Sequence, residues 1–291
     1  MLRYLSSTAA LAAFCVLLTG CAKPPPQLAP AESVHEVAAL SAYVAPEKSR
    51  KLLARYRHTA LTGRTLHVAS QGDIQLRKGE VVLTFDDGPS PKLTNTILDA
   101  LDAYHVKATF LVVGQMADAH PKTVQQVALR GHTIGTHTHD HADLAHETHN
   151  GAMGKIRAGY RAVARALAPI EAEPSPFFRF PYLSETRLLR ASLADDHMVV
   201  LGVDVDSSDY LKSTPEQVLN RTLARLDARG GGIILFHDIQ ARTAAMLPDF
   251  LEALEARHYE VVHLTPDRRG LFGKALVTAG LENENAITDI E

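Results

Sequence analysis

The chain has 291 residues, of which 46% are hydrophobic, so it carries enough apolar side chains for a substantial core and its composition is not that of a disordered protein. The formal charge of −3 is close to neutral, which argues against a nucleic-acid binder held by phosphate contacts. Tryptophan is absent, whereas 15 histidines are present, several of them clustered within residues 132–149.

Residues 1–20 have the pattern of an export signal. Arg3 supplies a positive start, and the apolar run from Ala9 to Leu18 is shorter than the ~20 residues of a membrane-spanning helix. The run ends in Leu18-Thr19-Gly20-Cys21, which resembles a bacterial lipoprotein signal whose cysteine becomes the lipid-modified first residue. An ordinary secretory signal cleaved nearby is the alternative. Since Cys15 lies inside the signal, we expect no disulfide in the mature chain.

Between Cys21 and residue 80 the sequence predicts a spacer followed by helices. Four prolines within residues 22–30 are typical of an extended spacer. Apolar residues at helical spacing between 31 and 58 predict one or two helices on the outside of the main domain. We therefore expect an exported protein that is lipid-anchored in the cell envelope. Because Ala22 rather than Asp follows the cysteine, the outer membrane is favoured where the envelope has two.

From residue 80 onward, strand and helix patterns alternate. Strands are predicted at residues 81–85, 108–113, 133–138, 177–180, 198–205, 233–236 and 260–264. Helices are predicted at residues 92–104, 116–130, 152–168, 188–196, 215–228 and 242–257. This alternation implies parallel pairing and an α/β fold, either a barrel or a doubly wound sheet. The main domain is expected to span residues 80–265, and residues 266–291 to form a polar tail.

Polar residues stand directly after most of the predicted strands. In parallel α/β folds the carboxyl ends of the strands meet at one edge, so side chains that follow successive strands converge there. These residues are Asp86, Asp87, His137, His141, Arg179, Asp206 and His237. Agreement among positions so distant in sequence is more specific than any single motif.

Asp86 and Asp87 are adjacent carboxylates at the end of a predicted strand. Two like charges raise the pKa of one carboxyl unless a cation lies near them. With Gly88 and Pro89 behind them, the pair is also typical of a plain turn, and these residues alone do not decide between the two. In the functional interpretation one carboxylate binds a metal and the other acts as a base.

His137 and His141 are candidate metal ligands. Their i, i+4 spacing places two imidazoles on one face of a helical turn, and a compact loop can also bring them together; a loop is the favoured prediction. Two imidazoles and one carboxylate make three protein ligands, the arrangement of catalytic zinc with a position open for water. We expect His139 to point away, and His146 and His149 to lie on the surface.

The polar residues at the predicted strand ends belong to five short segments. They are Thr84-Phe85-Asp86-Asp87-Gly88-Pro89, His137-Thr138-His139-Asp140-His141, Arg179-Phe180-Pro181-Tyr182, Asp206-Ser207-Ser208-Asp209-Tyr210 and Leu235-Phe236-His237-Asp238. In this order they resemble the motifs of the polysaccharide deacetylase family, the NodB-homology group of carbohydrate esterase family 4. The resemblance covers residues 80–265. It implies a single distorted (β/α)7-type barrel, preceded by a short helical or extended N-terminal segment.

The resemblance also implies catalytic roles. Asp86 matches the catalytic base, and Arg179 matches the arginine that orients this base. His237 matches the catalytic acid, which gives a proton to the leaving nitrogen. Asp206 matches the carboxylate that tunes this histidine, because a neighbouring negative charge raises an imidazole pKa.

The implied cofactor is a divalent metal, with Zn²⁺ expected first and Co²⁺ or another divalent ion as alternatives. Asp87, His137 and His141 match the family's Asp-His-His metal triad. Such an ion polarises a carbonyl and lowers the pKa of water from about 15.7 to about 7.

Four further positions match residues that contact substrate. The resemblance implies that Pro181 and Tyr182 line the groove, with the Tyr182 main-chain N–H as oxyanion donor. Leu235 matches a residue of the pocket for the acetyl methyl group. Tyr210 stands where the family often has tryptophan, so an aromatic side chain is kept but substrate preference is harder to transfer.

The function implied by the resemblance is metal-dependent removal of N-acetyl groups from a glycan that contains N-acetylglucosamine, such as peptidoglycan, a chitooligosaccharide or an exopolysaccharide. An O-acetyl esterase acting on acetylated xylan or another glycan is the near alternative, because the same site could serve it. A non-catalytic carbohydrate-binding protein is the alternative of another class. The expected partners are the acetylated glycan and a membrane reached through Cys21, with no nucleic acid.

Overall fold

The computed structural model describes residues 61–267. The predicted signal with Cys21, the spacer, the helices before residue 59 and the tail from residue 268 onward lie outside the described residues. Within residues 61–267 no helix combines the length and the apolar character that crossing a membrane requires.

Strands and helices alternate through most of the described chain. The strands are β1 Thr62–Val68, β2 Glu80–Asp86, β3 Thr109–Val112, β4 Thr133–Thr136, β5 Phe177–Phe178, β6 Val199–Val200, β7 Val205–Asp206, β8 Gly232–His237 and β9 Glu260–Pro266. The α-helices are α3 Pro91–Ala103, α4 Gly114–Ala119, α5 Pro121–Leu129, α6 His149–Leu167, α7 Arg187–Asp195, α8 Pro215–Arg229 and α9 Ala241–Ala256. Short 3₁₀ turns are η1 Gln71–Asp73, η2 Leu144–His146, η3 Ala168–Ile170 and η4 Pro181–Leu183.

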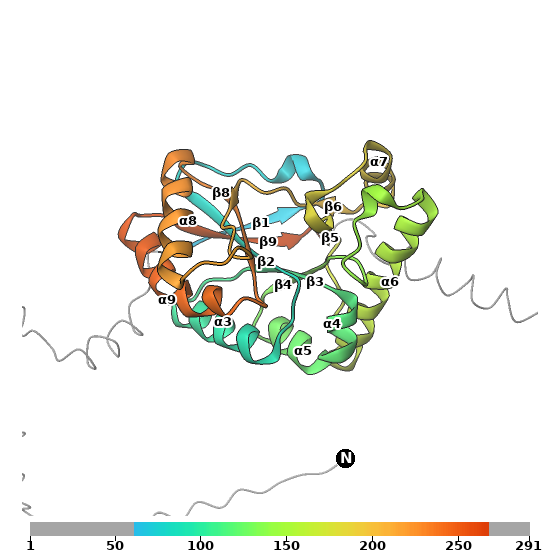
Figure 1. Cartoon of the computed structure of the whole chain (residues 1–291), viewed down its shortest axis with the longest axis horizontal. Helices are drawn as coiled ribbons and strands as arrows, with labels where there is room; N and C mark the ends of the chain where they lie inside the picture. Colours follow the sequence, from blue (N-terminus) through green and yellow to red (C-terminus); the bar gives the residue numbers. More distant parts are fainter. Residues whose placement is uncertain (1–60, 268–291) are drawn as a thin grey trace, which may run out of the picture. The chain divides into compact units, whose positions relative to one another are not determined.

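Parallel strands form an open barrel in the order β7-β8-β2-β3-β4-β5-β6. Figure 1 shows helices α8, α9, α3, α5, α4 and α6 arranged around the strands. Among the described residues β6 and β7 do not pair with each other, so the barrel is open between them. This parallel α/β architecture confirms the predicted fold class.

The strand pleat sorts side chains into two layers, because successive residues point to opposite faces. Val81, Leu83 and Phe85 belong to the large apolar cluster that includes buried residues of the surrounding helices. Val82 belongs instead to a second cluster, shared with Phe177 and other strand residues, inside the barrel. The barrel interior is therefore apolar at its base and turns polar towards the carboxyl ends of the strands.

The sheet begins earlier in the chain than residue 80, where the sequence placed the start of the domain. β1 pairs in parallel with β9, and the first residues of β9 pair with the start of β2. The burial of β1 alternates between exposed and partly buried residues, with only its last residue, Val68, fully buried. A strand of this kind lacks the continuous apolar run that marked the inner strands, which explains why the sequence pattern missed it.

Two predicted elements are each divided in the structure. The helix expected at 116–130 breaks into α4 and α5 at His120, because Pro121 takes the first position of α5 and cannot donate an intrahelical hydrogen bond. The strand expected at 198–205 is two short strands, since β6 pairs with β5 whereas β7 pairs with β8 on the other side of the opening.

Candidate active site

Asp86 and Asp87 stand at the carboxyl end of β2 with different environments. Val82, Thr84 and Asp86 alternate along β2 and face the barrel interior. Only 2% of Asp86 is exposed. Asp87 follows with a φ of 75°, a left-handed conformation that turns its carboxylate towards His137 and His141. Non-glycine residues held in this region cost about 1 kcal/mol or more, and such strain clusters at functional sites.

Arg179 holds Asp86 from inside the barrel. The guanidinium is 1% exposed and donates from Nη1 to Asp86 Oδ1 at 2.8 Å and to Thr84 Oγ1 at 2.8 Å. It also donates to the carbonyl oxygens of Leu201 and Gly202, at 3.3 and 2.9 Å, which lie in the opening between β6 and β7. Arg179 therefore links β2 to the segment that follows β6 and fixes one oxygen of Asp86.

Asp87, His137 and His141 bring one ligand atom each within 4.8 Å of one another. Asp87 Oδ1 lies 3.5 Å from His137 Nε2 and 3.2 Å from His141 Nε2. Both histidines lie in the segment after β4, which confirms the predicted loop placement rather than a helical turn. Within residues 61–267 no other three His, Cys, Asp or Glu side chains form such a cluster.

These three residues fit a divalent metal. His137 Nδ1 donates to the Arg179 carbonyl oxygen at 2.8 Å, which leaves the Nε2 lone pair facing Asp87. Burial lowers the pKa of His137, although Asp86 and Asp87 oppose this effect, so the ring stays neutral as a metal ligand must. Asp87 Oδ1 is buried, and within the described residues it accepts no hydrogen bond of good geometry. Two imidazoles and a carboxylate are a donor set that suits zinc.

His237, the register partner of Asp86 on the neighbouring strand β8, is held by Asp209. His237 Nδ1 lies 2.6 Å from Asp209 Oδ1, while Asp209 Oδ2 accepts a hydrogen bond from the His237 main-chain N–H at 2.8 Å. Thr243 at the start of α9 donates its hydroxyl to the same Oδ2. The opposite nitrogen, His237 Nε2, lies 4.0 Å from Asp87 Oδ2.

The expectation that Asp206 pairs with His237 is wrong. Asp206 Oδ1 accepts from the Ser208 main-chain N–H at 2.7 Å, and Oδ2 accepts from the Tyr210 hydroxyl at 3.1 Å. Asp206 ends β7 and Asp209 lies in the loop that follows, where the turn through Ser208, at a φ of 50°, sends Asp209 towards β8.

The surroundings of His237 favour its protonated form. Burial disfavours the charged ring, but the hydrogen bond and charge of Asp209, together with the charges of Asp86 and Asp87, raise the pKa of His237 to about 9. For Asp87, burial disfavours the anion, but the nearby His141, His137 and His237 hold the pKa of its carboxyl below the usual range.

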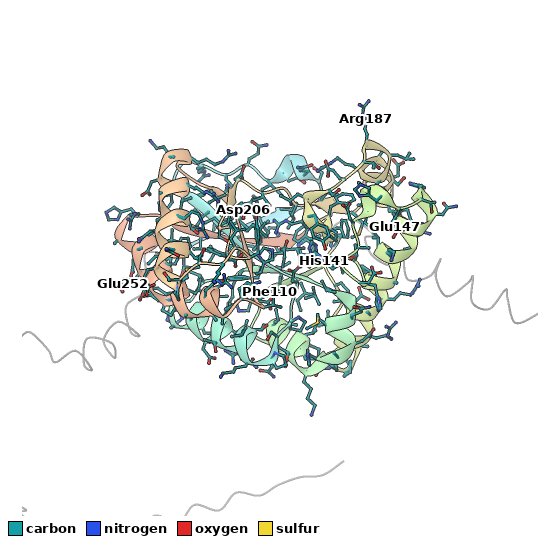
Figure 2. The ribbon with its side chains drawn as sticks, viewed as in Figure 1. Phe110, His141, Glu147, Arg187, Asp206 and Glu252 are labelled. Atoms are coloured by element: carbon teal, nitrogen blue, oxygen red, sulfur yellow. The ribbon has the colours of Figure 1, made fainter. Side chains whose placement is uncertain are left out.

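Two tyrosines stand beside the cluster. Tyr182, in η4, is 68% exposed and packs edge-on against His141 with ring centroids 4.6 Å apart. Tyr210 is 52% exposed and packs edge-on against His237 at 5.7 Å. In Figure 2 the labelled His141 and Asp206 lie towards the middle of the view, whereas Arg187 and Glu252 lie at its periphery.

The remaining predicted contact residues are buried. Pro181 is buried at the start of η4. Leu235 is 5% exposed and precedes His237 by two residues on β8, so both side chains project from the same face of the strand. Of the other histidines, His139 lies 3.3 Å from Asp118 and away from the cluster, and His146 pairs with Asp143 at the surface.

The sequence did not predict a role for four supporting side chains, Thr84, Thr94, Asp238 and Thr243. Thr84 accepts from Arg179 and donates to the Ile234 carbonyl oxygen at 2.7 Å, while Thr243 donates to Asp209. Only their place in or near the motifs signals a role, because nothing in local spacing distinguishes a threonine that faces a carboxylate from one that faces the core.

Asp238 is the most unusual of these supporting residues. It is 2% exposed, its Oδ2 accepts from the Thr94 hydroxyl at 2.6 Å, and its Oδ1 has no partner in the described chain. A Cβ on Gly88 would come within 2.1 Å of both carboxylate oxygens, so the carboxyl packs directly beneath the loop that carries Asp87. Burial, reinforced by the charges of Asp87 and Asp86, raises the pKa of Asp238 to about 7.

The family is shown by comparison with known proteins. The polysaccharide deacetylase family model matches residues 73–201. A chitooligosaccharide deacetylase of Bradyrhizobium sp. is 32% identical over 162 residues, which cover 54% of this chain and 70% of that protein. The chain belongs to the polysaccharide deacetylase family.

Two further comparisons extend this result. A peptidoglycan-N-acetylglucosamine deacetylase of Listeria monocytogenes is 31% identical over 182 residues, covering 62% of this chain but only 37% of that relative. The solved structure of a Bdellovibrio bacteriovorus peptidoglycan deacetylase is similar with a TM-score of 0.64 and 34% identity, covering 75% of this chain and 60% of that one. The matched region therefore spans little more than a third of the Listeria protein.

Proposed function

We propose that this chain is a hydrolase that removes N-acetyl groups from glycans containing N-acetylglucosamine and releases acetate. The observation that carries the proposal is the arrangement around the three candidate metal ligands. A carboxylate fixed by Arg179 and an imidazole fixed by Asp209 both stand beside them. A base and an acid held next to one electrophilic centre are what amide hydrolysis requires.

Asp86 is the proposed base. Its Oδ1 is bound to Arg179, and its Oδ2 faces the cluster, 3.9 Å from His137 Nε2. Oδ2 is therefore the oxygen that takes a proton from the attacking water. Fixing Oδ1 keeps Oδ2 in place without cost at the moment of reaction, which is how preorganised polar groups accelerate a step.

His237 is the proposed acid. Its Nδ1–H is directed at Asp209, so the proton available for transfer is the one on Nε2, which faces Asp87. As the amide C–N bond breaks, this proton goes to the nitrogen, which leaves as the amine. The hydroxyl of water stays on the carbonyl carbon, giving acetate. The raised pKa of His237, about 9, keeps this proton on the ring at neutral pH.

Asp87, His137 and His141 would hold the divalent metal. When bound, the ion supplies a Lewis acid for the carbonyl oxygen and lowers the pKa of water. The Tyr182 main-chain N–H is the proposed second stabiliser of the oxyanion, where losing one such donor commonly costs about 3 kcal/mol. Leu235, on the same strand face as His237, is the proposed contact for the acetyl methyl group.

The substrate class follows from the relatives. Those named above are described as acting on chitooligosaccharide or on the N-acetylglucosamine of peptidoglycan, which supports an N-acetylglucosamine polymer or oligomer here. The purified protein should be incubated separately with chitooligosaccharides, peptidoglycan fragments and acetylated xylan, and the released acetate measured. Acetate from the first two supports the proposal. Acetate from xylan alone would make the chain an O-acetyl esterase, and binding without acetate would make it a non-catalytic binder.

We also propose that the protein is exported and anchored to the cell envelope through lipid on Cys21. The segment Leu18-Thr19-Gly20-Cys21 and the proline-rich stretch after it support this location. Mass spectrometry of the mature N-terminus should find an acylated cysteine. An unmodified N-terminus at another position would replace the anchor with an ordinary secretory signal.

A further inference from the structure

Both carboxylate oxygens of Asp206, the last residue of β7, accept hydrogen bonds from the loop that follows it. Oδ1 accepts from the Ser208 main-chain N–H at 2.7 Å, and Oδ2 accepts from the Tyr210 hydroxyl at 3.1 Å and from the Ser208 hydroxyl at 3.3 Å. Asp209 meanwhile provides the contacts to His237. The Asp206 carboxylate is thus bonded to Ser208 and Tyr210, whereas Asp209 is the carboxylate bonded to His237.

Tyr210 is fixed at two places although half of it is exposed. Its hydroxyl is bonded to Asp206, and its ring meets the His237 ring edge-on at 89°, with centroids 5.7 Å apart. The exposed fraction of 52% leaves part of the side chain open to a ligand. A tyrosine held at its far end loses little rotamer freedom on binding, so its surface is ready to take the apolar face of a sugar ring.

Residues 206–208, which precede Tyr210, are held by hydrogen bonds from two arginines. Arg221 on α8 donates to the carbonyl oxygens of Ser207 and Ser208, both at 2.8 Å. Arg225, one helical turn further, donates to the Asp206 carbonyl oxygen and to the Ser208 hydroxyl. Because these bonds hold the main chain, the Asp206 carboxylate stays in place and keeps the Tyr210 hydroxyl that it accepts from in one position.

We infer that Asp206 is a positioning residue that holds Tyr210 as a rigid platform for the sugar next to the one being deacetylated. This inference rests on the proposed glycan substrate of the same site. It assigns Asp206 to substrate binding and leaves the protonation of His237 to Asp209. Substrates of two or more sugars should benefit from the platform, whereas a single N-acetylglucosamine should not, because it fills only the reacting position.

The test is a double-mutant cycle with Asp206→Ala, Tyr210→Phe and the double variant. Tyr259→Phe is a matched control, because its hydroxyl also lies near a carboxylate, 3.4 Å from Asp227 Oδ1, but belongs to neither the cluster nor the Asp206 loop. Kinetics on a series from N-acetylglucosamine to its pentamer should show KM rising about three- to tenfold for the oligomers in both single variants, the cost of immobilising one side chain on binding. The double variant should be no worse than the single ones, and kcat should be kept.

The pH profile of kcat distinguishes a role of Asp206 in positioning Tyr210 from an effect of Asp206 on the pKa of His237. If Asp206 acted on His237, the alkaline limb of the kcat profile would move to lower pH in Asp206→Ala, and that result would overturn the inference. Unchanged KM for oligomers in Tyr210→Phe would overturn it as well, and this variant carries the test if Asp206→Ala does not fold. Should the wild-type protein release no acetate, calorimetric binding of chitotetraose to the same variants decides: weaker binding supports the platform, and equal binding refutes it.

Discussion

Asp209 holds His237 at two points, the ring Nδ1 and the main-chain N–H, at 2.6 and 2.8 Å. The Asp209 carboxylate is fully buried, so no solvent shares its charge and its effect on the ring is strong. This pair gives the site a histidine that stays charged at neutral pH while its Nε2 faces the candidate metal ligands.

Replacing Asp209 should change the pH dependence of the reaction. In Asp209→Asn the pKa of His237 falls from about 9 towards its ordinary value of 6.5, because the anion that favours the charged ring is gone. An acid must be protonated to act, so activity should be lost at lower pH than in the wild-type enzyme. The kcat profile measures this, and an alkaline limb that does not move would refute Asp209 as the partner of His237.

Arg179 should matter for stability as well as turnover. Arg179→Met leaves the Asp86 carboxylate buried without its ion-pair partner, which typically costs about 3–5 kcal/mol in the free energy of unfolding. Arg190→Met is the matched control, since its pair with Glu185 is partly exposed and should contribute at most about 1 kcal/mol. Urea unfolding of both variants measures the difference, and equal losses would contradict the role of burial.

Asp86 and Asp87 should be separable by mutation. Asp86→Asn leaves the three candidate ligands untouched, so it should keep the metal while kcat falls about 10²- to 10⁴-fold, the usual worth of a general base. Asp87→Asn removes an anionic ligand and should lose metal affinity. Metal content and acetate release, measured on the same samples, test both, and normal turnover by Asp86→Asn would remove it as the base.

Asp238 should make the metal-free protein less stable as pH rises. Its folded pKa, about 7, lies above the ordinary 3.8, so between these values the folded state binds more protons than the unfolded state and stability declines with pH. At about 1.4 kcal/mol per pKa unit the decline is on the order of 4 kcal/mol. Asp238→Asn cannot ionise, so its stability relative to wild type should grow from pH 4 to pH 8. Urea unfolding in chelator measures this, and a constant difference would contradict a buried carboxyl that resists ionisation.

Where periodic strands carry the polar residues, the sequence predicted which of them converge in space. Asp86, Arg179 and His237 each come two residues after an inward-facing side chain of their strand. His137 comes two residues after Gly135 of β4. Since the pleat has a fixed period, an apolar run followed by a polar residue is enough to bring such positions to one edge of the barrel.

Side-chain directions in irregular loops could not be predicted from the sequence. Asp206 ends β7 and Asp209 lies three residues further on in the loop, and the turn through Ser208 decides which carboxylate reaches His237. Motif order could not supply this, because a loop has no period from which side-chain direction follows. β1 was missed for another physical reason: most of its residues face solvent at least in part, so it has no apolar run to recognise.

We expect release of acetate from an N-acetylglucosamine oligomer to require a metal held by Asp87, His137 and His141. The most direct measurement is acetate release from chitopentaose by the protein before chelation, after removal of metal, and after Zn²⁺ or Co²⁺ is added back, with metal content determined at each stage. Activity should be present before chelation, lost with the metal and recovered as metal content is restored. Full activity in metal-free protein would show that the metal is not needed.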